Sequence, residues 1–435
     1  MKLEVGNFQV KSVIFGSQTS FNNGVLTINK EEALEVVYED ERIISADIVI
    51  ARPGDSTRIT PVKEAVEPRY KVSGGVLFPG VTNKLMQVGS GRTHALKGTS
   101  VLAVGKHWGG FQDGLIDMSG PGSKQTMFSE LLNICLVADT NEDFEKNEQQ
   151  KKNEALRWGA MRLAEYLGSC VKDLEPEDMD VYHHHPLDEQ TEEIQNLPGV
   201  VYVLQLQSQM LDTGYNAMVY GWDVSRMLPT FMSPNELLDG AVVSGSFMPA
   251  SSKISTYQHV NNLVLKQLMN EHGETINFLG VIVSNLNTQL DEKERAALQV
   301  QNLATLLGAQ GAIISEEGYG NPDIDFILTY NNLENAGIKV VGITNECTGN
   351  DGKSQPLVDL SEKANAIVST GNVSEHLKLG PMEKVIGELE AVARDGNSGG
   401  WAESIKEDGS IEIENNGMFC ADSATGNHFK TVVEY

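Results

Sequence analysis

The chain has 435 residues, of which 40% are hydrophobic and 6% aromatic, and this is enough to build two or three domains with their own cores. Its 60 acidic and 33 basic residues give a net charge of −27, which repels phosphate backbones and argues against a nucleic-acid partner. The mean hydropathy is −0.23, no apolar run reaches the roughly 18 residues that span a bilayer, and the first residues lack the apolar segment of a signal peptide. We therefore expect a cytoplasmic protein that does not contact membranes.

The cysteines and histidines do not form a metal-binding pattern. Cys135, Cys170, Cys347 and Cys420 are scattered and include no CxxC pair, which is typical of free thiols in a reducing compartment. The triplet His183–His185 precedes Pro186 and a run of acids, so we interpret it as an exposed loop. The sequence predicts no metal site.

Residues 1–95 are predicted to be a β-rich domain. Alternating and β-branched runs, separated by turn residues, predict the strands Phe8–Phe15, Val25–Ile28, Ile43–Ile50 and Arg58–Val62. The glycines between Gly74 and Gly91 indicate loops that lead out of this domain.

Residues 96–249 are predicted to be an α/β domain. Short apolar runs predict the strands Ser100–Val104, Asn133–Ala138, Val200–Leu206 and Ala241–Val243. Between the second and third of these, the apolar spacing predicts a helix over Asn141–Leu167.

Residues 250–435 show the clearest alternation of strands and helices. Predicted strands are Ile276–Ser284, Gly311–Ser315, Ile338–Ile343 and Ala364–Ser369; predicted helices are Asp291–Leu307 and Pro322–Asn335. Because such alternation implies right-handed crossovers, we expect a parallel sheet. The predicted class is α/β, with parallel-sheet domains after a β-rich N-terminal region.

Polar residues follow each strand of this predicted sheet. Ligands bind outside the carboxyl ends of parallel strands, and four polar loops at one edge favour a ligand site over simple helix caps and turns. The candidate residues are Asn285, Glu316, Glu317, Asn321, Asn345, Glu346, Cys347 and Thr348.

Two of these positions have possible catalytic roles. If Glu316 and Glu317 face one cleft, their repulsion would raise one pKa and create a general acid; alternatively, one of them caps the helix that starts at Pro322. Cys347 is a possible nucleophile or redox partner, or else an inert thiol.

A second polar loop follows the strand Ser100–Val104. Here Lys106 is a candidate for holding a carboxylate, and His107 for moving protons. The sequence contains neither GxGxxG nor GxxxxGK[ST], which argues against a nucleotide site.

Several long strings resemble the pyruvoyl proprotein subunit of component B of glycine, sarcosine and betaine reductases. They include GRTHALKG (Gly91–Gly98), VGKHWGGFQDGLIDM (Val104–Met118), LDGAVVSGSFMP (Leu238–Pro249), EEGYGNPD (Glu316–Asp323) and GITNECTGNDGKSQPLV (Gly342–Val358). The resemblance extends from end to end.

The resemblance implies an enzyme subunit with a self-derived cofactor. In this family the proprotein cuts itself at a cysteine, which becomes a pyruvoyl group whose carbonyl binds the substrate amine as a Schiff base. A selenocysteine of a partner subunit of component B then attacks the α-carbon, and the carboxymethyl group passes to selenoprotein A. The implied assembly is an oligomer acting on glycine, sarcosine or betaine, and the choice among them stays open.

The sequence departs from this pattern at the processed position, which aligns with Ala250. Alanine has neither a nucleophile nor a leaving group, so this form is expected to stay uncleaved, to lack the pyruvoyl group and to be inactive. Ser251 is a possible substitute for the missing nucleophile. Two explanations fit, a blocked variant of a cleaving protein or a natural paralogue, and the intact surroundings favour the first. The alternative function is a non-catalytic scaffold that docks the selenoprotein partner.

Overall fold

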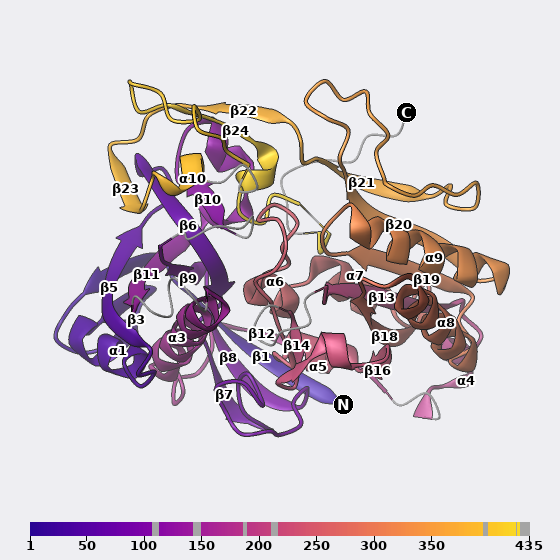
Figure 1. The fold of residues 1–435 in the computed structure, drawn as a ribbon. Coiled ribbons are helices and arrows are strands. Elements are labelled where there is room, and N and C mark those ends of the chain that lie inside the picture. The colour runs from indigo at the N-terminus through magenta and orange to yellow at the C-terminus, as the bar shows by residue number, and fades with distance from the viewer. Residues whose placement is uncertain are drawn as a thin grey trace.

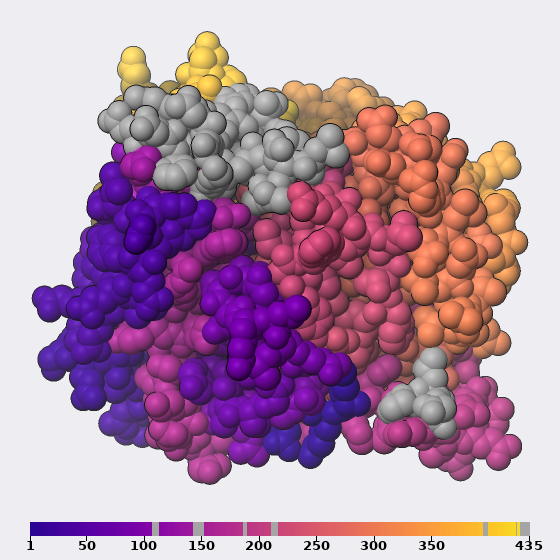
Figure 2. All heavy atoms as spheres, turned by 60° about the horizontal axis from the view of Figure 1, so that its bottom comes forward, coloured from indigo at the N-terminus to yellow at the C-terminus, as the bar shows by residue number. Residues whose placement is uncertain are grey.

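A computed structural model gives the fold and describes residues 1–106, 113–141, 149–185, 189–209, 216–394, 399–422 and 424–426. Two lobes lie side by side, and a smaller sheet lies between and below them in Figure 1. Figure 2 shows N-terminal residues on one side of the molecule and later residues, in orange, on the other. Over the described ranges, no helix combines the length and apolar character needed to cross a bilayer.

The first lobe is built on a mainly antiparallel sheet. Its strands, in spatial order, are β10 (Gly114–Asp117), β6 (Thr57–Val66), β9 (Thr99–Val104), β11 (Leu132–Thr140) and β5 (Ile43–Ala51). Helices α1 (Lys30–Val37) and α3 (Gln149–Ser169) pack on this sheet. The side chain of Asn29 caps α1 by accepting the N–H groups of Glu31 and Glu32 at 3.1 and 3.3 Å.

The second lobe is a six-stranded sheet in which all pairings but one are parallel. In spatial order it contains β16 (Thr230–Met232), β18 (Asn277–Leu286), β13 (Gly199–Gln207), β19 (Gly311–Glu316), β20 (Lys339–Glu346) and β21 (Ile367–Asn372). β16 pairs with β18 in the antiparallel sense. These elements confirm the predicted α/β class.

Both faces of the second sheet are covered. Helices α8 (Leu290–Leu306) and α9 (Asn321–Asn335) pack together over one face, and α7 (Leu263–Glu271) contacts β18. Consecutive β13 residues therefore enter different cores: Val201 and Val203 lie with α9, Tyr202 and Leu204 with α7. Burial on both faces explains the continuous apolar run of this strand.

Smaller elements complete the fold. A four-stranded sheet contains β12 (Asp178–His183), β1 (Lys2–Gln9), β8 (Gly91–Lys97) and β7 (Arg69–Ser73). Two three-stranded sheets contain β2 (Ser12–Phe15), β4 (Val25–Ile28) and β3 (Ser20–Asn22), and β15 (Trp222–Asp223), β14 (Met218–Val219) and β17 (Val242–Val243). The remaining strands are β22 (His376–Leu379), β23 (Lys384–Gly387) and β24 (Ile411–Glu414), and the remaining helices α4 (Glu192–Gln195), α5 (Pro234–Leu238), α6 (Thr256–Val260) and α10 (Ala391–Arg394).

The tertiary pairings cross the segment boundaries expected at residues 95 and 249. β13 lies between β18 and β19, although it was placed with the middle segment, and β23 pairs in parallel with β6. A short apolar run shows that a strand forms but not which sheet it joins, and this explains the difference. The expected loop region ends where β8 begins, at Gly91.

The expectation of an exposed histidine loop holds only in part, because His183 is exposed but belongs to a strand, and its neighbour His184 is buried. His183 is the last residue of β12, and a ring nitrogen of the buried His184 lies 3.3 Å from the carbonyl oxygen of Phe278. The local polarity of the sequence did not reveal that this segment packs against β18.

Candidate functional site

Residue 250 is held by the chain segment that returns near the C-terminus. Ala250 is fully buried, and its carbonyl oxygen accepts the N–H of Cys420 at 2.8 Å. The next residue continues the pairing: the N–H of Ser251 donates to the carbonyl oxygen of Asn416 at 3.1 Å, and its own carbonyl accepts the N–H of Asp422 at 2.9 Å. The backbone at residue 250 is therefore fixed before any partner binds.

Glu317 follows the end of β19 and links the segment after residue 250 to the end of β13. One carboxylate oxygen accepts the N–H of Ile254 and the other accepts the N–H of Gln207, both at 2.9 Å. Burial raises the pKa of Glu317 to about 7, and the two N–H donors oppose that rise. This carboxyl group can exchange a proton near neutral pH a few residues from position 250.

Asn345, in the last part of β20, reaches the same segment through Asp422. Its Nδ2 donates to a carboxylate oxygen of Asp422 at 2.8 Å and to the carbonyl oxygen of Gly318 at 2.9 Å. The hydroxyl of Thr370 in β21 lies 3.4 Å from the other carboxylate oxygen. The structure thus links Glu317 and Asn345 to the segment that contains Ala250 and Ser251.

A buried charged pair lies beside residue 250. The amine of Lys253 donates to the carbonyl oxygen of Gly245 and lies 3.7 Å from a carboxylate oxygen of Glu64. The other oxygen of Glu64 accepts the N–H of Thr256 at 3.0 Å. Burial lowers the pKa of Lys253, and Glu64 opposes that effect. Sequence analysis missed Glu64, which lies in β6 together with two other charged residues, Arg58 and Lys63.

Two further buried groups accompany them. His259 is fully buried, neither of its ring nitrogens has a hydrogen-bond partner within the described residues, and burial lowers its pKa to about 3. Burial raises the pKa of Cys420, whose backbone has a left-handed φ of 52°. A buried non-glycine residue in this region stores strain, and such residues concentrate at functional sites. Nothing local in the sequence indicated Cys420.

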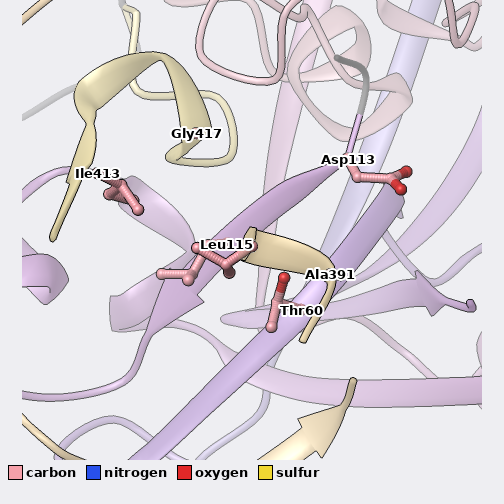
Figure 3. A pocket seen from close by; sticks show the side chains of 7 residues that line it. Thr60, Asp113, Leu115, Ala391, Ile413 and Gly417 are labelled. Carbon is pink, nitrogen blue, oxygen red and sulfur yellow. The ribbon is translucent and has the colours of Figure 1, made fainter. Parts of the chain in front are cut away.

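A small pocket adjoins the returning segment on the side of the first lobe. Figure 3 shows it between β6, β10, α10 and β24; it is lined by Thr60, Asp113, Leu115, Ala391, Val392, Ile413 and Gly417. Asp113 forms an ion pair with Lys63, and the N–H of Phe419 donates to the carbonyl oxygen of Leu115 at 2.9 Å. The segment that holds residue 250 therefore also forms one wall of this pocket.

Glu316 and Glu317 do not share a cleft, and this corrects the expectation of a mutually repelling pair. Glu316 is the last residue of β19 and accepts the hydroxyl of Thr344 at 2.7 Å, on the side of Asp323. Burial, followed by Asp323, raises its pKa well above the ordinary value. Successive residues of a strand point to opposite faces, so adjacency in sequence separates these carboxylates.

Other predicted residues lie elsewhere on the sheet edge. Asn285 donates to the carbonyl oxygen of Met227 at 3.1 Å, and Oδ1 of Asn321 accepts from Gln209 at 2.9 Å. Cys347 is exposed, with Sγ 3.5 Å from the hydroxyl of Ser374. These three contacts are made with residues other than the segment that holds residue 250.

The remaining candidates contact other parts of the structure. Glu346 accepts the N–H of Val373 through its carbonyl at 2.9 Å, and Thr348 donates its N–H to Asn372 at 3.2 Å. Lys106 is exposed in the first lobe, 3.4 Å from a carboxylate oxygen of Asp139. His107 lies outside the described residues.

Comparison with known proteins defines the class of this α/β chain. A family described as "Glycine/sarcosine/betaine reductase component B subunits" matches residues 1–433, so the chain belongs to this family of amino-acid reductase subunits. It is 62% identical over 442 aligned residues to the "Betaine reductase complex component B subunit alpha" of Peptoclostridium acidaminophilum, with 100% of both chains covered.

Two more distant relatives come from the same organism. The "Sarcosine reductase complex component B subunit alpha" is 45% identical and the "Glycine reductase complex component B subunits alpha and beta" 43% identical, each covering 95% of both chains. No solved structure matches the chain. The resemblance drawn from the sequence strings is confirmed.

The site does not fit the pyruvoyl group that the resemblance implied. Residue 250 carries only a methyl group, and its surroundings are filled with protein. Without sulfur or oxygen on this side chain, the backbone has no attacking atom and nothing to eliminate. No step of the chemistry can be assigned to such a group in this chain.

Proposed function

We propose that this chain is the component B alpha subunit of a betaine reductase and that it works as one uncleaved polypeptide. The observation that carries the proposal is the methyl side chain at residue 250, in a chain 62% identical to a betaine reductase subunit. On this view Ala250 is a natural residue, not a block of an otherwise cleaving protein.

The chemistry of betaine supports an uncleaved subunit. A Schiff base requires an amine that carries a proton, and the nitrogen of betaine is bonded to four carbons. This substrate also needs no carbonyl to activate it, since trimethylamine is a neutral leaving group. A selenolate of the partner subunit displaces it directly: the Se–C bond forms, the C–N bond breaks, and the nitrogen keeps the electron pair.

The names of the relatives agree with an uncleaved betaine reductase subunit and a cleaved glycine reductase subunit. The glycine reductase relative is named as subunits alpha and beta, and the betaine reductase relative as subunit alpha alone. The sarcosine reductase relative is also named as one subunit, so the higher identity favours betaine over sarcosine.

The residues around position 250 would then hold in place the surface of this subunit that contacts the substrate. Glu317, Asp422 and Asn345 fix the backbone through the hydrogen bonds described above, and a protein that presents a fixed surface lowers the entropy cost of bringing nucleophile and substrate together. The attacking selenocysteine would come from the partner subunit.

The wild-type chain, assembled with its selenoprotein partners, tests the proposal. We expect trimethylamine release from betaine, faster than ammonia from glycine or methylamine from sarcosine. Intact mass should show one chain of 47.4 kDa, and hydrazine or borohydride should not modify it. A reactive carbonyl on the wild-type chain, or reduction of glycine but not betaine, would contradict it.

A second candidate is the precursor of a pyruvoyl subunit, favoured by the hydroxyls of Ser251 and Ser252, which are buried and have no partner within the described residues. This candidate predicts that Ala250→Cys cuts itself into fragments of about 27 and about 20 kDa, scaled by length, and that the protein gains activity only after this cut.

A third candidate is a non-catalytic scaffold. It predicts an assembled complex whose betaine reduction is unchanged by substitutions around residue 250.

A further inference from the structure

A cavity with a volume of about 330 Å³ lies at the amino-terminal edge of the sheet in the second lobe. Gly199 and Asn277, the paired first residues of β13 and β18, form part of its wall. β13 ends at Gln207, which bonds to Glu317, so the cavity and the site around residue 250 lie at opposite ends of this strand. The other lining residues come from β18, from the segment around α4 at the lower right of Figure 1, and from the turn after α8: Gln190, Gln195, Leu197, Leu279, Leu307, Gly308 and Gln310. A volume of this size can hold a small organic molecule.

Hydrogen bonds between the lining residues hold the wall in place. Oε1 of Gln310 accepts the N–H of Gly199 at 3.0 Å, and the N–H of Gln310 donates to the carbonyl oxygen of Gly199 at 2.7 Å. Nε2 of Gln195 donates to the carbonyl oxygen of Gln190 at 2.9 Å. Nδ2 of Asn277 donates to Oε1 of Gln190, also at 2.9 Å. The side chains of Gln190 and Asn277 are therefore in direct contact, and we call them the amide pair.

The amide pair leaves one donor and one acceptor unused. Within the described residues, Nε2 of Gln190 and Oδ1 of Asn277 have no hydrogen-bond partner, although these residues are only 7% and 5% exposed. Turning both side-chain amides over leaves the same set, because each carries one oxygen and one NH₂ group. A buried donor and a buried acceptor left unpaired cost free energy, so the pair favours a guest that supplies a partner for each.

The rest of the lining determines the charge and polarity of such a guest. The described residues that line the cavity carry no charged side chain, so a charged guest would lose its water without gaining a counter-ion. Leu197, Leu279 and Leu307 add apolar side chains to the wall. An uncharged molecule with one polar end and one apolar end fits this combination.

We propose that this cavity binds a small uncharged molecule with a primary carboxamide, whose carbonyl oxygen accepts Nε2 of Gln190 and whose N–H donates to Oδ1 of Asn277. The apolar part of the molecule lies against the leucines. The site is separate from the chemistry proposed around residue 250 and does not depend on it. Binding therefore needs the intact chain alone, without a partner subunit.

Benzamide is the probe, and ligand-observed NMR titration of the wild-type chain is the measurement. We expect benzamide to bind with a Kd of about 1 mM. N,N-dimethylbenzamide lacks the N–H donor, and benzoate lacks it and is charged, so both should bind at least about tenfold more weakly. This series needs no variant. No binding of benzamide up to about 10 mM, or equal affinities for benzamide and its dimethyl derivative, would show a cavity that holds water only and would overturn the proposal.

Gln190→Glu tests the amide pair itself. It keeps an oxygen that accepts Nδ2 of Asn277 but replaces the donor Nε2 with a second oxygen, so the affinity for benzamide should fall at least about tenfold. Gln87→Glu makes the same change at an exposed loop position and should leave the Kd unchanged. Circular dichroism establishes that both variants are folded. Equal affinities of the folded Gln190→Glu and Gln87→Glu variants for benzamide would place the binding elsewhere and overturn the assignment.

Discussion

At the scale of one residue, burial of the carboxyl group of Glu317 makes the free energy of unfolding depend on pH. Its pKa is raised from 4.5 to about 7, so between these values the folded protein binds a proton that the unfolded chain has released. The free energy of unfolding therefore falls as pH rises through this window, by at most roughly 3 kcal/mol for this group. Above pH 7 the loss is complete.

We predict that Glu317→Gln removes this pH dependence. Because glutamine does not titrate, the variant should gain on the parent by up to about 3 kcal/mol between pH 4.5 and 7.5, after a constant penalty for presenting an amide to two N–H donors. Urea unfolding at several pH values measures the difference. Glu294→Gln, at an exposed position of α8, is the control, and parallel curves for Glu317→Gln and the parent would contradict the cause assigned to the shift.

At the scale of the elements, α8 and α9 are joined by a buried ion pair. Lys293 of α8 bonds to the carboxylate of Asp325 in α9, and both residues are 2% exposed. Burial raises the pKa of Asp325 to about 6, and Lys293 opposes that rise. The pair therefore depends on both partners being present.

We predict that Lys293→Met destabilises the chain by about 3 kcal/mol, because it leaves the carboxyl group of Asp325 buried without its cation. Adding Asp325→Leu should recover most of the loss, since a buried pair replaced by apolar groups is close to neutral. Thermal and urea unfolding of the two single variants and the double variant give the coupling energy. A double variant as unstable as the sum of the two single variants would contradict this account.

The sequence predicted those elements well where the pattern is local. The strands and helices from Asn277 to Asn372 lie within a few residues of the predicted ones, because apolar periodicity and helix-ending glycines act over short distances. The same reasoning could not place β13 between β18 and β19, or β23 beside β6, because each pairing joins segments far apart in the chain.

The candidate site shows the same limit. Glu317 and Asn345 were found because they follow strands of one parallel sheet, and residue 250 because of the family strings. Glu64, Cys420 and Asp422 were missed, since they reach residue 250 only through tertiary contacts. The role expected for Glu316 was wrong because strand geometry turns it away from Glu317.

At the scale of the whole molecule, the peptide bond before residue 250 does not separate two independent bodies. β13, from the first 249 residues, lies in the middle of the sheet formed by the later residues, and β23, from the later residues, extends the sheet of the first lobe. The returning segment adds contacts on both sides, since Phe419 bonds to Leu115 and the carbonyl oxygen of Ala424 accepts the hydroxyl of Ser315.

We predict that residues 1–249 and 250–435, expressed together as separate chains, form one complex that co-migrates with the intact protein on size exclusion and separates only in denaturant. Residues 250–435 expressed alone should be insoluble or unfolded, because β18 and β19 lose the strand between them and expose apolar faces. Circular dichroism and size exclusion measure both outcomes. A stable, folded 250–435 fragment would show that this lobe does not need β13, and the same topology would then allow a cut before residue 250 to release two free domains.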